Sequence, residues 1–315
     1  MPTCPVAGID VGKTFLDVAC APQPATFRVA NGPTGIATLI ARLARVGVTR
    51  VVIEAIGIYA APLIRALQRA GLSVGIVNPR RIKAFRDAEG KRAKTDRLDA
   101  SLIARFALAM TDAIRPLPSE HQLALKALAT RRRQLVEMIA MEKTRLKQAP
   151  DPRIAASHRA AIASLTSERT AIETALEAHL ARDPELKRKR QVLTSIPGIG
   201  QQVATVLVTD LPELGTLDRR AVASLSGLAS HIQQSGMAPG RAQIGGGRPC
   251  VRAALYMAAL SAVRCDAGLR AAYQAMRADG KPAKVALIAI ARKLATIANA
   301  LLKSGQTFRP NASQA

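Results

Sequence analysis

Aromatic residues are scarce in this chain. Its 315 residues include no Trp, three Tyr and five Phe, so aromatic residues make up 3% of the sequence. RRM and OB domains bind single strands by stacking bases on aromatic side chains. The composition therefore disfavours a single-strand module of that kind.

Cysteine and histidine are also few and form no metal-binding pattern. The four cysteines contain no CxxC pair, and the four histidines are scattered. A zinc site is therefore not expected, and unpatterned thiols are typical of a reducing cytoplasm. The first residues lack a basic stretch followed by an apolar run, and no uncharged apolar run is long enough to cross a bilayer. We therefore expect a soluble cytoplasmic protein without a signal peptide or a membrane span.

Acidic residues are outnumbered by basic ones. The chain has 46 Lys and Arg against 22 Asp and Glu, a net charge of +24. This excess costs self-repulsion on folding, and a polyanion such as nucleic acid offsets it. Hydrophobic residues still make up 49% of the chain, enough to bury a core. The length predicts two domains with a connecting segment.

The first part of the chain has an α/β pattern. Short apolar strands alternate with helical segments, which predicts a mixed sheet covered by helices. The expected strands are Val6–Val11, Phe15–Cys20, Thr26–Val29, Val51–Glu54 and Ser73–Val77, and the expected helices are 34–46, 60–70 and 95–110. Three hairpin-linked strands followed by two strand–helix units is the order of an α/β RNase H-like fold. We expect this domain to span residues 1–115.

The rest of the chain is expected to be mainly α. Residues 116–190 predict a helical hairpin interrupted at Pro150 and Pro152, acting either as a coiled-coil seam or as a spacer with solvated faces. Residues 191–303 form the expected C-terminal domain, followed by a tail over 304–315. Its Ile196–Gly200 turn and the helix after it resemble a helix-hairpin-helix element. There, backbone N–H groups at Gly198 and Gly200 would face a DNA phosphate.

Four acidic residues stand out in a chain with few acids. Asp10 ends the first expected strand and Glu54 the fourth, while Asp96 and Asp99 are three residues apart on a helix. Taken singly, each could be a turn, strand-end or capping residue. Taken together, they could form one cluster, and clustered carboxylates repel unless a cation lies among them. Oxygen ligands favour Mg²⁺ or Mn²⁺, which serve phosphoryl transfer.

A glycine-rich loop follows later in the chain. It contains Ser235, Arg241 and Gly245–Arg248, and Arg252 comes soon after it. Arg241, Arg248 and Arg252 could clamp phosphate oxygens, and the glycines permit close approach of an anion. Ser235 is either a cap or turn residue or a nucleophile, and no adjacent His or Lys supplies a base.

Taken together, these motifs resemble the DEDD transposases of the insertion sequence 110 family. They follow in order over about residues 6–260: Gly8–Lys13, Glu54–Tyr59, Val77–Pro79, Lys94–Ala100, Ile196–Gly200, Ser235-Gly236, Gly246–Arg248 and Arg252–Ala259. The sequence departs from the family pattern at Ile56, where Thr is usual after Glu-Ala. The acid itself is intact.

The resemblance implies a specific mechanism. The first domain would be RuvC-like and would hold divalent metal, Mg²⁺ or Mn²⁺, on Asp10, Glu54, Asp96 and Asp99. Ser235 would be the nucleophile that forms a transient covalent link to a DNA phosphate. Family members assemble as dimers that pair into tetramers, with domains of different protomers completing each site. A structured bridge RNA guides them by pairing with donor and target DNA.

Three other interpretations stay open at this point. The chain could be a DNA invertase of the same family. It could be a metal-dependent nuclease or junction resolvase in which Ser235 is structural. It could also be a basic scaffold that only binds nucleic acid. Replacing Ser235 with Ala separates the first from the second, because it stops recombination but spares hydrolysis.

Overall fold

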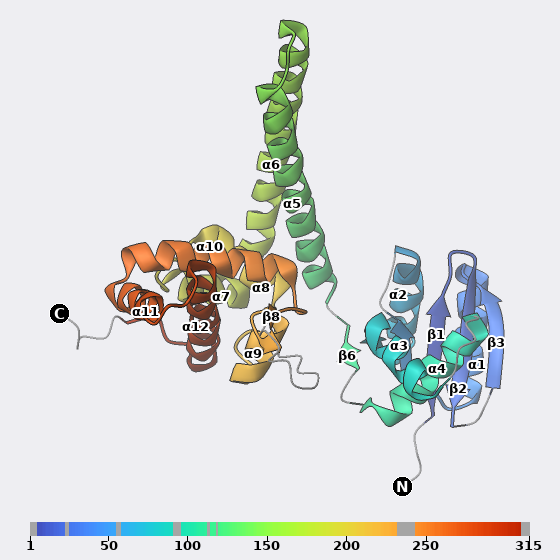
Figure 1. Ribbon diagram of the computed structural model, residues 1–315. Coiled ribbons are helices and arrows are strands. Elements are labelled where there is room, and N and C mark those ends of the chain that lie inside the picture. Colours follow the sequence, from blue (N-terminus) through green and yellow to red (C-terminus); the bar gives the residue numbers. More distant parts are fainter. Residues whose placement is uncertain are drawn as a thin grey trace. The chain divides into compact units, whose positions relative to one another are not determined.

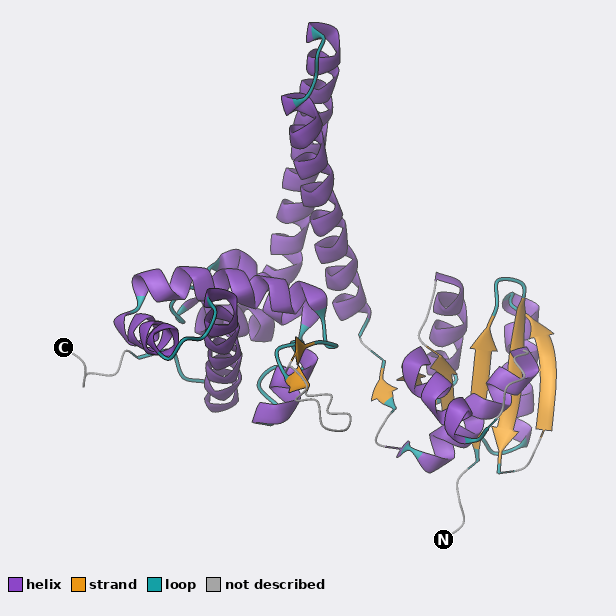
Figure 2. Cartoon of the chain, in the orientation of Figure 1, coloured by secondary structure: helices purple, strands orange, loops and turns teal. Residues whose placement is uncertain are grey.

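The computed structural model describes residues 5–22, 25–54, 58–90, 96–111, 114–117, 119–231 and 243–309. The chain divides into two compact units, Met1–Pro118 and Ser119–Ala315, which are treated separately below (Figure 1). The first is a sheet with helices, and the second is mainly helical (Figure 2). The expected subdivision of the second unit near residue 190 stays a prediction.

The first unit is built on one mixed sheet in the strand order β3-β2-β1-β4-β5-β6. β1, β2 and β3 are antiparallel, β4 and β5 run parallel to β1, and β6 is antiparallel to β5. The strands are β1 Val6–Val11, β2 Phe15–Ala21, β3 Ala25–Ala30, β4 Arg50–Glu54, β5 Ser73–Val77 and β6 Arg115–Pro116. The helices are α1 Pro33–Arg45, η1 Ile58–Ala60, α2 Ala61–Arg69, α3 Pro79–Ala88 and α4 Asp96–Ala109.

Helices cover both faces of this sheet. Ile9 and Ile53 pack on one face with Leu39 of α1 and Leu63 of α2. The opposite face is covered by α3 and α4 through separate apolar clusters. Central strands that are buried on both faces require continuous apolar runs, which is why they stand out in the sequence.

This arrangement confirms the expected RNase H-like order of three hairpin-linked strands followed by two strand–helix units. α3 is not among the helices expected from the sequence, which assigned no element between the strand Ser73–Val77 and the helix at 95–110. In the structure Asn78 caps α3 by accepting a hydrogen bond from the N–H of Arg80 at 2.9 Å, and Pro79 is the first helical residue. Asn followed by Pro is a recognised start of a helix.

Gly8 sets the distance between α4 and the sheet. A Cβ atom built on Gly8 would lie 2.3 Å from the backbone N of Ala104 and 2.5 Å from the carbonyl O of Ala100. Both atoms belong to the α4 backbone, which lies across β1 and β2 (Figure 1). Only glycine therefore allows the helix to lie this close to β1, and the small residues Ala100 and Ala104 serve the same contact from the helix side.

The second unit consists of a long helical hairpin and six further helices among its described residues. The hairpin helices are α5 Glu120–Lys147 and α6 Pro152–Arg182. The remaining elements are α7 Pro184–Thr194, α8 Gln201–Asp210, α9 Arg219–Leu225, β7 Ser230–His231, β8 Gln243–Ile244, α10 Pro249–Cys265, α11 Ala267–Ala278 and α12 Ala283–Ser304. α5 and α6 pack along each other and project from the other helices of the unit (Figure 1). Ser119 forms a capping box with Gln122 at the start of α5, and Asp151 caps α6.

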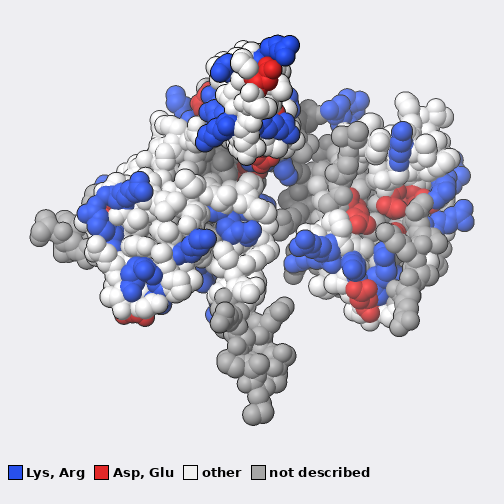
Figure 3. Space-filling model, turned by 45° about the horizontal axis from the view of Figure 1, so that its top comes forward, with Lys and Arg blue, Asp and Glu red and all other residues white. Residues whose placement is uncertain are grey.

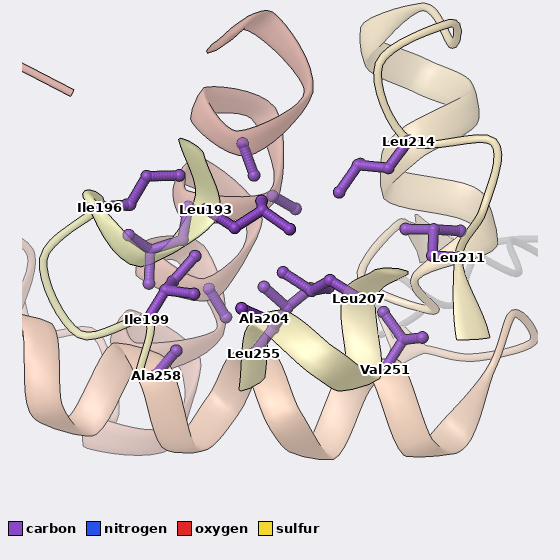
Figure 4. Packing of buried hydrophobic residues seen from close by; sticks show 14 of the residues in the cluster. Leu193, Ile196, Ile199, Ala204, Leu207, Leu211, Leu214, Val251, Leu255 and Ala258 are labelled. Atoms are coloured by element: carbon purple, nitrogen blue, oxygen red, sulfur yellow. The ribbon is translucent and has the colours of Figure 1, made fainter. Parts of the chain in front are cut away.

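One apolar core joins the helices of the second unit. Leu193 of α7, Leu207 of α8 and Leu255 of α10 meet there (Figure 4). α12 contributes Ile290 and Leu294, which are almost fully buried. α12 is long and apolar enough to cross a bilayer by composition alone. Its buried face in this core accounts for its apolar character.

We predict that Gly8→Val destabilises the first unit by about 1–3 kcal/mol or more, because the added side chain must push α4 away from β1. Gly32→Ala is the matched control, since a Cβ at Gly32 meets nothing within 4 Å. Gly32 is the N-cap of α1, and Ala is a poorer N-cap residue than Gly, so this change should cost no more than about 1 kcal/mol. Denaturant unfolding of both variants gives the comparison. Equal losses would show that α4 does not depend on Gly8.

Candidate active site

Two of the expected acids lie side by side at the end of the central strands. β1 and β4 are parallel neighbours, and Ile9 lies opposite Ile53, so the next residues, Asp10 and Glu54, are adjacent. Successive side chains of a strand point to opposite faces of the sheet. The side chains of Asp10 and Glu54 therefore point away from the apolar face on which Ile9 and Ile53 pack. Asp10 and Glu54 are both partly exposed and lie on the face covered by α4.

α4 brings a third expected acid to the same face. Asp99 directly precedes Ala100 on α4. The carbonyl O of Ala100 lies close to Gly8 of β1, and Gly8 is two residues before Asp10. Asp99 is only 7% exposed, and Arg86 of α3 donates a hydrogen bond to its Oδ1 at 2.5 Å. A buried carboxylate requires such a partner to remain charged. The sequence analysis missed Arg86 because it did not predict α3.

The fourth expected acid, Asp96, begins α4, and its side chain lies outside the described part of the structure. Among the side chains that are described, no group of three His, Cys, Asp or Glu residues is placed to hold a metal ion. Asp99 is paired with Arg86, and a metal site shared by all four acids stays a prediction. The oxygen donors of Asp10 and Glu54 fit a hard divalent cation in chemistry and in position.

A further acid on this face was missed by the sequence analysis. Asp17 of β2 lies directly opposite Asp10 and is 3% exposed. Arg28 of β3 lies opposite Asp17 and donates to it from Nη2 at 2.7 Å and from Nε at 3.0 Å. Glu54, Asp10, Asp17 and Arg28 thus form one row across four neighbouring strands. Arg28 provides the positive charge for a row that otherwise contains three acids, and its guanidinium lies 5.4 Å from the ring centroid of Phe15. Asp17 could have been recognised from the sequence, because it is a charged residue inside the apolar run of β2.

The helix-hairpin-helix element of the second unit consists of α7, the turn at 195–200 and α8. Gly198 has a φ of +83°, and a Cβ there would lie 2.4 Å from the carbonyl O of Ala258. The turn is thus packed against α10, beside Ile199 and Ala258 (Figure 4). Gly200 is exposed and caps α8 without a side-chain bond, so the first amides of α8 lie at an open helix end. Contact between either glycine and a DNA phosphate stays a prediction.

Ser235 and Arg241 lie outside the described residues. The two short strands that flank this segment in sequence, β7 and β8, pair with Ser230 opposite Ile244. Shortly after β8, Gly247 has a φ of +59°, and a Cβ there would lie 2.2 Å from the N of Gly227. The glycine at this position therefore allows contact between two chain segments, a role that the sequence analysis did not assign.

Arg248 and Arg252, the two arginines of this region that the structure describes, form hydrogen bonds to groups of the protein itself. Arg248 donates to both carboxylate oxygens of Glu213 at 2.6 Å and to the carbonyl of Asp210 at 2.9 Å. Asp210 is buried and also accepts a 2.6 Å hydrogen bond from Arg133 of α5. Arg252 donates from Nη1 to the carbonyl of Gly246 at 3.1 Å. These contacts fix the start of α10 to α8 and the hairpin, and phosphate binding by Arg248 and Arg252 stays a prediction.

Cys250 lies close to this network but is poorly suited to act as a nucleophile. Burial, and after it the nearby Asp210 carboxylate, raise the pKa of the Cys250 thiol above its ordinary value. The thiol therefore stays protonated near neutral pH, whereas the thiolate is the reactive form. Cys250 thus offers no ready alternative to Ser235.

We predict that Arg28→Ala lowers the free energy of unfolding of the first unit by about 1–3 kcal/mol, because Asp17 is left buried without its counter-charge. Arg69→Ala, an exposed arginine at the end of α2, should cost less than about 1 kcal/mol. Adding Asp17→Asn to Arg28→Ala should recover part of the loss. Denaturant unfolding measures all three, and absence of this recovery would contradict the charge argument.

We also predict a coupling energy of about 1–2 kcal/mol between Arg248 and Glu213 in a double-mutant cycle without nucleic acid. The pair is bidentate and partly buried. Arg131 and Glu168, an exposed pair at 2.9 Å between α5 and α6, should couple by less than about 1 kcal/mol. If the two cycles give equal coupling, Arg248 has no special structural role.

Comparison with known proteins agrees with this architecture. A family model described as transposase, of the DEDD and IS110 type, matches residues 7–150. A second, described as the transposase IS116/IS110/IS902 family, matches residues 190–274. The first covers the acidic residues of the sheet and of α4, and its DEDD class is consistent with dependence on a divalent metal.

Similar proteins include two that are named for DNA inversion and one from an insertion element. The pilin gene-inverting protein of Moraxella bovis is 30% identical over 264 residues, which is 82% of this chain and 81% of that protein. The protein of the same name from Moraxella lacunata gives the same values. The insertion element IS110 uncharacterized 43.6 kDa protein of Streptomyces coelicolor is 31% identical over 152 residues, covering 47% of this chain and 38% of that protein.

Among solved structures, T. thermophilus RuvC in complex with a Holliday junction substrate is 20% identical with a TM-score of 0.29, covering 36% of this chain and 99% of that one. The family models and the long Moraxella matches confirm the resemblance that the motifs indicated. The chain belongs to the IS116/IS110/IS902 family of transposases, enzymes that recombine DNA.

Proposed function

We propose that this enzyme cuts and rejoins DNA with a divalent metal, Mg²⁺ or Mn²⁺, held by Asp10, Glu54, Asp96 and Asp99, and with Ser235 as the nucleophile. The observation that carries the proposal is the adjacency of Asp10 and Glu54 on two parallel strands, under a helix that bears the other two acids. In a chain with only 22 acids, this concentration favours a metal site.

The chemistry assigned to each group follows from phosphoryl transfer. A bound divalent metal would stabilise negative charge on the phosphate during the exchange. The Ser235 hydroxyl would form an ester with a DNA phosphate, while the broken strand leaves with a free hydroxyl. A hydroxyl of the new partner strand would then attack that ester and release Ser235.

Asp99 already has a positively charged neighbour in this scheme. Its Oδ1 accepts a hydrogen bond from Arg86, so a bound metal would be a second cation at this carboxylate. The guanidinium and the metal serve the same electrostatic need, because each compensates the charge of a buried carboxylate.

The charge of the chain supports a nucleic-acid substrate. Lys and Arg are spread over the visible face of both units and are far more frequent than Asp and Glu (Figure 3). We propose that the partners are donor and target DNA and a bridge RNA, with the protein acting in the cytoplasm. A guide RNA would supply the sequence specificity. We also propose that the chain acts as a dimer that pairs into a tetramer.

DNA inversion is the second candidate. Two relatives that match over 82% of this chain are named pilin gene-inverting proteins. Inversion and transposition use the same cutting and joining steps and differ in how the DNA sites are arranged. A plasmid with two inverted copies of the native flanking sites, and one with a single excisable element, would separate them by product length.

The proposal predicts a covalent adduct on Ser235. The protein is expressed with its flanking DNA, denatured rapidly, digested with nuclease and examined by mass spectrometry. We expect a nucleotide remnant on the Ser235 peptide that disappears in Asp10→Asn and Ser235→Ala. Ser224→Ala, an exposed serine of α9, is the matched control and should keep the adduct.

Other outcomes would assign a different function. DNA nicking that needs metal and survives in Ser235→Ala would identify a hydrolytic nuclease with a structural serine. Nucleic-acid binding without nicking or adduct, in the presence of the adjacent non-coding RNA, would identify a scaffold. Nucleic-acid affinity should fall by roughly 10³-fold or more between 50 and 200 mM salt if many phosphates are contacted.

A further inference from the structure

The second unit contains an open cavity that no proposed role has used. Its volume is about 550 Å³, within the range of pockets that bind small organic groups. The cavity is lined by residues of α10, α12, the β7–β8 pair and the connection before β7: Leu228, Ser230, Ile244, Tyr256, Lys284, Val285, Ile288, Ala289 and Arg292. The lining comes entirely from described residues.

The cavity lies beside the two strands that flank the segment containing Ser235, the proposed nucleophile. Ser230 of β7 and Ile244 of β8 are paired residues, and both line the cavity. The segment that contains Ser235 leaves β7 and returns to β8. The chain therefore enters and leaves that segment at the edge of the cavity.

The wall of the cavity is apolar and partly open to solvent. Ile244 is 36% exposed and Val285 is 54% exposed, although both are large apolar residues. Tyr256 adds an aromatic ring in a chain that has only three tyrosines. An exposed concave apolar surface of this kind marks a place where another group is bound.

The rim of the cavity is positively charged. Lys284 and Arg292 both belong to α12, and both line the cavity. Within the described part of the chain, neither makes an ion pair with an acidic side chain. α12 also begins beside Lys284 without a side-chain cap at Pro282, so its first amides add positive potential there.

We infer that this cavity binds one nucleotide of the DNA strand that the enzyme cuts. The base enters the apolar pocket beside Tyr256 and Ile288, and the neighbouring phosphates contact Lys284 and Arg292. The inference rests on the proposed function, since it assumes that a DNA strand lies at β7 and β8. A peptide would account for the apolar wall, whereas Lys284 and Arg292, which make no ion pair with the described residues, favour a polyanion such as DNA.

Photo-crosslinking tests this assignment at the level of a single residue. A single-stranded DNA oligonucleotide that carries 5-iododeoxyuridine is bound at about 200 mM salt to suppress non-specific contacts. It is then irradiated, and crosslinked peptides are identified by mass spectrometry. We expect a crosslink on Tyr256. Tyr59 and Tyr273 are the other tyrosines of the chain and provide an internal control.

Matched variants show whether the cavity itself is responsible. Ala289→Phe fills the cavity and should lower the Tyr256 crosslink by about tenfold or more. Met257→Phe adds the same ring at a residue of α10 that is 60% exposed and does not line the cavity, and it should leave the crosslink unchanged.

Lys284→Ala should weaken DNA binding and lower its salt dependence by about one phosphate contact. Lys293→Ala is the matched control at an exposed lysine, and it should weaken DNA binding less.

The folded state of each variant is checked by thermal unfolding. If Ala289→Phe does not fold, Val285→Glu replaces it, because Val285 is largely exposed and Glu is compatible with a helix. An acidic group at the rim should lower the crosslink by a similar factor.

Several results would overturn the inference, and they can be told apart. If no crosslink forms on Tyr256, or if the Tyr256 crosslink persists in Ala289→Phe, the cavity does not bind the nucleotide. Either result would leave the proposed function in DNA recombination uncontradicted. A Tyr256 crosslink obtained with an RNA oligonucleotide alone would reassign the pocket to RNA. A changed oligomer size with normal DNA crosslinking would assign it to a protein contact. Failure to bind any DNA would reject the inference together with the proposed function.

Discussion

The close contact between Gly8 and α4 is the constraint on which the proposed metal site depends. The acids of this site come from two different kinds of element, strand ends and a helix. The strand acids are fixed by the register of β1 and β4, but the helix acids reach them only if α4 lies almost directly on the sheet. A larger residue at position 8 would separate the two groups without changing any acid. The missing side chain of Gly8 is thus part of the site, although it contributes no functional group.

The second constraint is electrostatic. Acids that are brought together need positive charge nearby, and the first unit provides it with arginine. Arg28 neutralises Asp17 at one end of the row across the sheet, and Arg86 neutralises Asp99 on α4. Arginine suits both places because its planar guanidinium is always charged and can donate several hydrogen bonds. The basic excess is therefore not only a surface property for binding nucleic acid, since two of the arginines stabilise buried acids of the sheet and of α4.

The sequence allowed the order of elements along the first unit to be predicted, because each strand is a short apolar run that ends in a turn or an acid. It also placed Asp10 and Glu54 at strand ends that could meet at one edge of the sheet, and the parallel register of β1 and β4 makes them neighbours. It did not reveal Asp17, because its place beside Asp10 depends on the hairpin register. The Arg248–Glu213 pair was also missed, because residues that are 35 positions apart become neighbours only through packing of the helices.

Arg248 and Gly247 show why a motif does not by itself assign a role. In isolation, a run of glycines followed by arginine fits an anion site, since both features suit phosphate. In the folded chain Gly247 allows contact with Gly227, and Arg248 binds Glu213. These contacts hold the two ends of the segment that contains Ser235. A nucleophile must be positioned by rigid neighbours, because a small displacement of the reacting atoms slows the reaction strongly. The family motif around Ser235 therefore combines the proposed nucleophile with residues that hold the flanking parts of the chain together.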